Sequence, residues 1–118
     1  MQEQLLVELE GLGNKISEFV ARLGGMEAVC LKLIKKFPND TNYQEYMAIA
    51  QEGNYENAET SIHTLKGVSS NLGLTTITEV SQEILNAIRG NDLSQINQLN
   101  DRLKEAYEKN MKIFQRYQ

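Results

Sequence analysis

The amino-acid sequence predicts an all-α protein, folded as an antiparallel up-down-up-down four-helix bundle with an additional N-terminal helical segment. Apolar residues recur at intervals of three and four along the chain, which is the spacing of one helix face. The sequence has one proline and little of the alternation that is typical of strands. Short links place successive helices antiparallel. The bundle helices are expected at about residues 26–52, 55–72, 76–89 and 92–117.

The N-terminal segment, residues 3–23, has helical apolar spacing but contains Gly11 and Gly13. Glycine is unfavourable inside a helix, so this segment is expected to be frayed or to form a short separate helix. Gly24 and Gly25 are then expected to end it.

The first bundle helix, residues 26–52, contains the only proline, Pro38. Proline lacks a backbone N–H and clashes with the preceding turn. The helix is therefore either kinked at this residue or divided in two, and the sequence leaves both alternatives open. Cys30, the only cysteine, lies among apolar residues and is expected in the core, and a single cysteine excludes an internal disulfide.

The second bundle helix, residues 55–72, follows Gly53 and an expected N-cap, Asn54. At about 100° per residue, its apolar residues fall on one stripe that faces the core. His63 lies about 140° from that stripe, so its side chain is expected to face solvent. The stripe consists of Ala58, Ile62, Leu65, Ser69 and Leu72.

The third bundle helix, residues 76–89, is expected to begin with Thr75 or Thr76 as its N-cap. Glu79 then occupies the position that completes a capping box.

The last helix, residues 92–117, follows Gly90, with Asn91 or Asp92 as its expected N-cap. Its outer face carries charges of both signs, which are typical of a solvated helix surface.

The composition excludes several functional classes. The 118 residues suit one domain, residues 1–118. A net charge of -4 without a basic run argues against nucleic-acid binding. No apolar run approaches the roughly 18 residues of a membrane span, and the first residues lack the order of a signal peptide, so a cytoplasmic protein is expected. One histidine and one core cysteine cannot supply the three or four ligands of a typical zinc site.

The most informative stretch surrounds the only histidine, His63. Lys66 and Gly67 follow it by three and four residues, and residues at these intervals are neighbours on a helix surface. A mid-helix glycine costs about 1 kcal/mol relative to alanine, and the packing stripe does not require one here. Gly67 is therefore interpreted as clearance for a bulky partner. Ser70 lies on the same face.

His63, Leu65, Lys66, Gly67 and Gly73 match the motif His-x-Leu-Lys-Gly followed by a glycine six residues later. With these residues the chain resembles the histidine phosphotransfer (HPt) domain family over most of its length. The resemblance implies that His63 accepts a phosphoryl group from an aspartyl phosphate in a response-regulator receiver domain. His63 would then pass the group to another receiver, in a phosphorelay that begins at a hybrid histidine kinase. Lys66 would stabilise the phosphoryl group, and Gly67 would leave room for the receiver.

One position departs from the family pattern. Many members have a polar residue, often Gln or Glu, where this sequence has Leu85, and that residue helps to orient the imidazole or the phosphoryl group. Gln82 and Arg89 lie on the same side of the helix at intervals of three and four and are candidates to replace it. Alternatively, Leu85 joins an apolar docking patch. Ser70 is a further candidate hydrogen-bond donor.

The sequence lacks the parts that generate a phosphoryl donor. It has no Gly-x-x-x-x-Gly-Lys-[Ser/Thr] loop for a nucleotide, and no aspartate cluster adjoins His63 to hold Mg²⁺. We therefore expect a monomeric phosphocarrier that is not an enzyme and has no cofactor, with Mg²⁺ bound by the partner receiver domain. The alternative is a helical receiver-binding or adaptor module that docks its partner without phosphotransfer.

Overall fold

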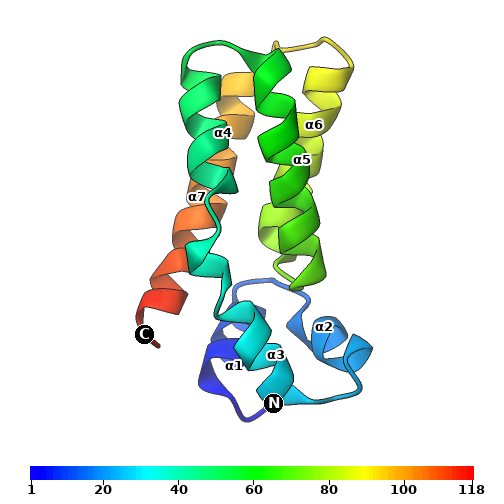
Figure 1. Ribbon diagram of the computed structural model, residues 1–118, viewed down its shortest axis with the longest axis vertical. Coiled ribbons are helices and arrows are strands. Elements are labelled where there is room, and N and C mark those ends of the chain that lie inside the picture. Colours follow the sequence, from blue (N-terminus) through cyan, green and yellow to red (C-terminus); the bar gives the residue numbers. More distant parts are fainter.

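The computed structural model describes residues 1–118, which form seven α-helices, one short 3-10 turn and no strands. Four helices form an antiparallel up-down-up-down bundle: α4 (Asn42–Gln51), α5 (Tyr55–Asn71), α6 (Thr75–Arg89) and α7 (Ile96–Gln115) (Figure 1). The predicted all-α bundle is therefore confirmed. The molecule is elongated, with extents of 43 × 25 × 20 Å. None of the helices combines the length and the hydrophobicity that a membrane span requires.

Three shorter helices lie at the end of the bundle where α5 ends and α6 begins (Figure 1). They are α1 (Gln4–Gly11), α2 (Ile16–Arg22) and α3 (Glu27–Ile34), and we call them the N-terminal lobe. The expected N-terminal segment is thus two separate helices, divided at Gly13, which has a φ of 116°. This positive φ favours glycine and explains why one continuous helix does not form.

The expected helix over residues 26–52 is broken at Pro38 rather than kinked. The α3 helix ends before the proline, a single 3-10 turn (Phe37–Asn39) contains it, and α4 begins after it. Proline suits the start of such a turn because no N–H is needed there. The Asp40 carboxylate then accepts a hydrogen bond from the Asn42 backbone N–H at 3.1 Å. As a result, only α4 belongs to the bundle, and α3 joins the lobe.

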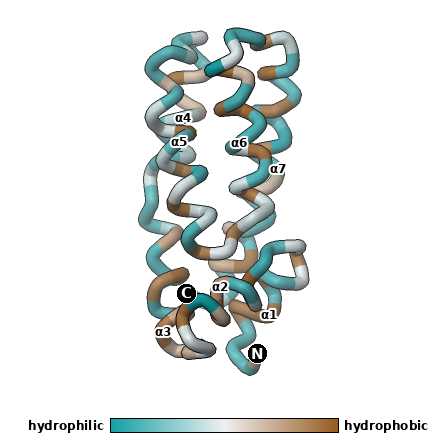
Figure 2. The backbone as a smooth tube through the Cα atoms, turned by 90° about the vertical axis from the view of Figure 1, so that its right-hand side faces the viewer, coloured by the Kyte–Doolittle hydropathy of each residue, from teal (hydrophilic) through white to brown (hydrophobic).

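The α3 helix packs one face into the lobe and leaves the other exposed. Cys30 is fully buried, as predicted, and burial raises the pKa of its thiol, which keeps it protonated. Most residues of α3 are hydrophobic, as the colouring of the tube in Figure 2 shows. Met26, Val29 and Leu33 remain exposed on its outer side.

The prediction of a capping box at the start of α6 is wrong, because no side chain caps this helix start. Both threonines at the start of α6 instead contact the N-terminal segment. The Lys15 backbone N–H donates to Thr75 Oγ1 at 3.1 Å, and the Thr76 hydroxyl donates to Asn14 Oδ1 at 2.8 Å. The contact with the lobe therefore takes the place of the local contact with Glu79.

The last helix starts later than expected, at Ile96 rather than near residue 92. Asp92 does not cap it. Its carboxylate accepts hydrogen bonds from the Ser94 backbone N–H at 3.2 Å and the Ser94 hydroxyl at 2.7 Å. Aspartate often forms such local turns, which compete with helix initiation.

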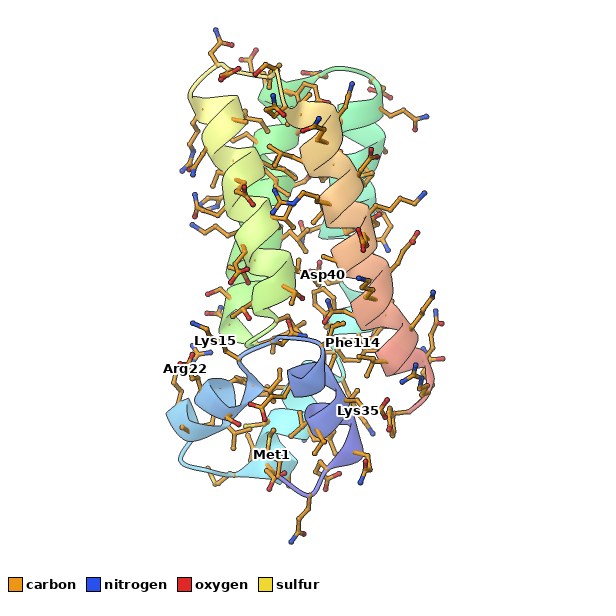
Figure 3. All side chains as sticks on the ribbon, turned by 180° about the vertical axis from the view of Figure 1, so that it is seen from behind. Met1, Lys15, Arg22, Lys35, Asp40 and Phe114 are labelled. Atoms are coloured by element: carbon orange, nitrogen blue, oxygen red, sulfur yellow. The ribbon has the colours of Figure 1, made fainter.

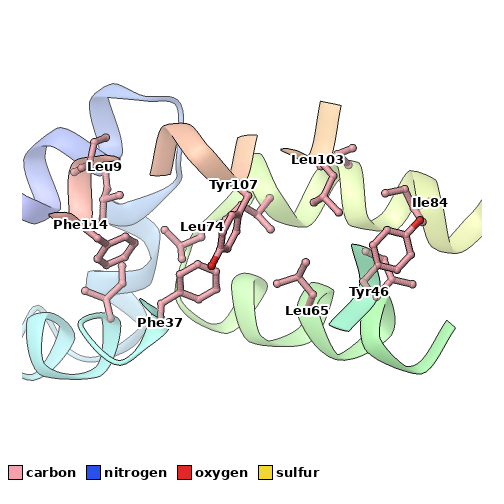
Figure 4. Packing of buried hydrophobic residues seen from close by; sticks show 14 of the residues in the cluster. Leu9, Phe37, Tyr46, Leu65, Leu74, Ile84, Leu103, Tyr107 and Phe114 are labelled. Atoms are coloured by element: carbon pink, nitrogen blue, oxygen red, sulfur yellow. The ribbon is translucent and has the colours of Figure 1, made fainter. Parts of the chain in front are cut away.

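One hydrophobic core of 25 buried residues runs through both the bundle and the lobe (Figure 4). Aromatic side chains join the two parts, because the Phe37 ring lies 5.9 Å from that of Phe114 and 6.1 Å from that of Tyr107 between centroids. Tyr46 is also fully buried. Its hydroxyl donates to Asn100 Oδ1 at 2.6 Å, and burial raises the pKa of this hydroxyl, which keeps it a donor.

A buried polar network fastens the lobe to the bundle. Asn14 and Asn110 are 3% and 0% exposed, and Asn14 Nδ2 donates to Asn110 Oδ1 at 2.8 Å. Asn110 Nδ2 donates to Thr76 Oγ1 at 2.9 Å and to the Ala106 carbonyl at 2.7 Å. Asn14 Nδ2 also donates to the Leu9 carbonyl at 2.9 Å. Buried polar groups with this many partners favour one arrangement of the elements over others.

We predict that Asn110→Ala lowers the free energy of unfolding by about 2 kcal/mol, because it removes one hydrogen-bond partner each from the buried Asn14 amide and from Thr76. Urea unfolding followed by circular dichroism measures this loss. Lys112→Ala is the matched control, since Lys112 is exposed on the same helix and should change stability by less than about 0.5 kcal/mol. Equal losses in the two variants would contradict a structural role for the network.

Candidate functional site

The candidate site lies on α5, which has one buried and one exposed face. Asn54 caps its start as predicted, because the Asn54 side chain accepts a hydrogen bond from the Asn57 backbone N–H at 3.3 Å. The helix ends before Gly73, whose φ is 74°. The buried face contains Ala58, Ser61, Ile62, Leu65 and Ser69, with Leu72 half-buried, so the predicted stripe is essentially confirmed.

His63 is exposed on the outer face of α5, as the helical spacing predicts. Lys66 is half-buried, and its ammonium takes no part in any of the four salt bridges of the molecule. Side chains on a helix lean toward its N-terminus, so Lys66, three residues after His63, extends toward the imidazole. The site therefore places an uncommitted positive charge beside an accessible ring.

Gly67 has open space on the side where a side chain would be. A Cβ at this position would meet no heavy atom within 4 Å. Its helical backbone does not require glycine, since its φ is not among the positive values. Neither packing nor backbone geometry therefore explains the residue, in agreement with its interpretation as clearance for a partner.

The α6 helix runs antiparallel beside α5, and two contacts fix their register. Near the lobe, Ser69 Oγ and Thr78 Oγ1 are 2.8 Å apart and share a hydrogen bond. Near the other end, Arg89 Nε donates to Glu59 Oε1 at 3.1 Å. The middle of α6 is therefore level with the stretch of α5 that carries the site.

In this register Leu85 is level with His63, but its side chain is fully buried. The alternative in which Leu85 joins an exposed docking patch is therefore wrong. It lies next to Ile84 on the buried side of α6, where the core stripe is wide enough to include both residues. Gln82 is the half-buried polar side chain on the α5 side, and its Nε2 donates to Asn86 Oδ1 at 2.8 Å. Gln82 is level with Lys66 rather than with His63.

Arg89 lies near the site but forms an ion pair with Glu59, which is one turn before His63 on the outer face of α5. Both side chains remain substantially exposed, at 52% for Arg89 and 41% for Glu59. Exposed ion pairs of this kind contribute little stability and exchange partners easily. No sequence pattern indicated this pair, because its members are 30 residues apart on different helices.

Ser70, at the end of the site nearest the lobe, is exposed. Its backbone carbonyl accepts a hydrogen bond from Arg22 Nη2 at 3.3 Å. No motif or spacing in the N-terminal segment indicated that Arg22 reaches α5.

The arrangement suits nucleophilic chemistry on an anionic group. His63 exposes its imidazole to solvent, and an unprotonated ring nitrogen of histidine is a nucleophile. Phosphoryl transfer needs positioning and positive charge more than acid–base groups, and Lys66 is the nearest cation to His63 along the outer face of α5. No group of three or more His, Cys, Asp or Glu side chains is placed to hold a metal ion.

Comparison with known families gives one match: the model of the Hpt domain matches residues 3–109, which is nearly the whole chain. Neither the curated proteins nor the solved structures gave a match.

Proposed function

Because the chain belongs to the Hpt domain family, we propose that its 118 residues form one Hpt unit that shuttles phosphoryl groups between receiver-domain aspartates through His63. Hpt domains are phosphocarriers without kinase activity, and they work in phosphorelays with two-component partners. The observation that supports the proposal best is the exposed His63 beside a free Lys66 and an unobstructed Gly67.

The proposed step is one displacement at phosphorus. A neutral ring nitrogen of His63, Nε2 in this proposal, attacks the phosphorus of an aspartyl phosphate held by a receiver domain. The new N–P bond forms as the acyl P–O bond breaks, and the electron pair of that bond leaves on the aspartate carboxylate. The other ring nitrogen keeps its proton or releases it to water. The reverse step delivers the phosphoryl group to a second receiver.

The neighbouring side chains have distinct proposed roles. Lys66 neutralises charge on the equatorial phosphoryl oxygens, as a compact ammonium can. Gln82 and Ser70 flank Lys66 and supply hydrogen bonds to the phosphoryl group. Arg89 is a second cation, which leaves its ion pair with Glu59 and pairs with the phosphohistidine instead. Mg²⁺ belongs to the receiver, where it stabilises the leaving carboxylate.

Incubation with a phosphorylated receiver domain tests the proposal directly. Phosphate should move to the protein, and the bond formed should be stable in alkali and labile in acid, as expected for phosphohistidine. The alternative function, an adaptor without phosphotransfer, predicts binding of the receiver with no phosphate on the protein. A hybrid histidine kinase supplied with ATP should label the protein only through its receiver domain.

We predict that Gly67→Leu slows transfer from the receiver by at least about tenfold, because a side chain at this position occupies the space beside His63 through which the receiver approaches. The variant should keep or slightly raise thermal stability, since glycine is unfavourable inside a helix. Transfer is measured by following labelled phosphate in quenched samples.

Gly67→Ala is the control for this prediction. Its Cβ meets no neighbour within the protein, so it should gain stability by up to about 1 kcal/mol and slow transfer much less than leucine. Transfer at the normal rate in Gly67→Leu would contradict the clearance argument.

A further inference from the structure

Beyond the phosphorylation site, a polar cleft continues the outer face of α5 into the N-terminal lobe. We call it the lobe cleft. It has a volume of about 480 Å³ and no hydrophobic residue in its lining. Two of its residues, Lys15 and Arg22, come from the lobe and carry positive charge, and Figure 3 shows both where the lobe meets the bundle. The remaining lining residues are Glu18, Ser70, Gly73 and Thr75.

Direct contacts with the bundle hold the Arg22 guanidinium and the backbone of Lys15. Arg22 Nη2 donates to the carbonyls of Ser70 at 3.3 Å and Asn71 at 3.4 Å, at the end of α5. Its guanidinium also lies 5.9 Å from the centre of the Phe19 ring. The Lys15 backbone is fixed by its hydrogen bond to Thr75 Oγ1 at 3.1 Å. The lobe cleft is therefore joined directly to the end of α5 and the start of α6.

The surface of α5 is positive on the side of His63 that faces the lobe cleft and negative on the other side. Ser70 is seven residues after His63, so the cleft begins about 10 Å from the imidazole along the helix axis. Lys66, Lys15 and Arg22 make that side positive, with Glu18 as the only acid in the cleft lining. Toward the N-terminus of α5, Glu56 and Glu59 lie on the same outer face as His63. Of these two, only Glu59 is paired with a cation.

We propose that the lobe cleft binds an acidic segment of the receiver domain that exchanges phosphate with His63. This inference rests on the proposed function, because it names the surface that orients the partner during transfer. The ammonium of Lys15 has no ion-pair partner in the molecule. The Arg22 guanidinium has none either, but it donates hydrogen bonds to carbonyls of α5. An acidic segment seated there turns the receiver so that its aspartyl phosphate faces the imidazole.

Charge complementarity of this kind mainly affects association. Charges at the rim of an interface guide encounter and fix register, and their mutation changes the association rate and its dependence on salt. Lys15 is the residue to test, because its side chain is exposed and unpaired. Arg22 is unsuitable, because its contacts with α5 carbonyls would make loss of structure and loss of docking inseparable.

The experiment compares Lys15→Glu with the wild type and with Lys104→Glu. Lys104 is exposed on α7, which is not adjacent to α5 in the bundle, so this control makes the same change of charge away from the site. The probe is the unphosphorylated receiver domain that binds the wild-type protein best in a panel, and affinity is measured by calorimetry at low and high salt. A parallel assay measures labelling of each protein by phosphoramidate, a small donor that needs no docking surface.

We expect Lys15→Glu to weaken receiver binding by about tenfold at low salt and much less at high salt, while Lys104→Glu has little effect. Labelling by phosphoramidate should be the same in all three proteins. Equal affinities for Lys15→Glu and the wild type at low salt would overturn the proposal, as would equal losses in the two variants. Failure of phosphoramidate to label the wild type would instead count against His63 as the phosphorylated residue, without affecting the binding result.

Discussion

His63→Gln abolishes the transfer of phosphate from a phosphorylated receiver domain, which is the largest effect on activity that we expect from a single substitution. The glutamine amide nitrogen has no available lone pair, so no N–P bond can form. The free energy of unfolding should change by less than about 0.5 kcal/mol, because the imidazole is exposed. Labelled phosphate on the protein and a urea unfolding curve measure the two quantities.

Thr64→Gln provides the matched control, because Thr64 is the exposed neighbour of His63 on α5. Its hydroxyl contacts only the Thr60 carbonyl of its own helix, at 2.9 Å. This variant should still be labelled, whereas His63→Gln should bind the receiver without being labelled. Labelling that persisted in His63→Gln would show that another residue carries the phosphate.

Gly73→Ala should lower the free energy of unfolding by about 3 kcal/mol, the largest effect on stability that we expect. The residue has a φ of 74°, which costs about 1–2 kcal/mol for an L residue with a side chain. A Cβ there would also lie 2.8 Å from Phe19 Cβ and 3.0 Å from the Lys15 carbonyl oxygen. The helix start that carries these atoms would have to move, and overpacking of this kind adds about 1–3 kcal/mol.

Gly53→Ala separates the two causes. Gly53 has nearly the same φ, 77°, but its Cβ would meet nothing within 4 Å. It should therefore cost only the backbone term of about 1–2 kcal/mol. Urea unfolding of both variants gives the difference, which is the contribution of the contact that Gly73 makes with Phe19 and Lys15. Equal costs would mean that Gly73 matters only for its backbone conformation.

The two glycines of the Hpt motif thus differ in what their surroundings require. Gly67 has no neighbours and a helical backbone, so no contact within the molecule requires glycine there. Gly73 is enclosed by the lobe and is required by the fold. The apolar stripe of α5 already indicated that packing does not require glycine at position 67. The sequence could not predict the role of Gly73, because the contact joins residues that are more than 50 positions apart.

The bundle and the orientation of its central helix could be predicted from the sequence, because both depend on a local period. An apolar stripe repeats every three to four residues in α5, and the position of His63 relative to it follows from helix geometry. The N-cap at Asn54 was predictable for the same reason, since its hydrogen bond closes within three residues.

What the sequence could not predict depends on contacts between distant parts of the chain. Thr75 and Thr76 suited a local cap, but the N-terminal segment binds both of them instead. The pair of Arg89 and Glu59 crosses between helices, and burial of Leu85 depends on how α6 is rotated against its neighbours. The separation of α3 from the bundle at Pro38 was one of two alternatives that local rules allowed.

The buried network of Asn14, Thr76 and Asn110 has a consequence for how the protein is made. The first three helices are synthesised long before Asn110. The lobe therefore cannot form its contact with α7 until nearly the whole chain has been synthesised. Helices α4 to α6 form hairpins with their neighbours in sequence, which is fast. The lobe meanwhile keeps apolar surface exposed, and nascent chains in that state are prone to aggregate. Early termination of translation before Asn110 should therefore yield a product with a formed hairpin region and an undocked, chaperone-binding N-terminus.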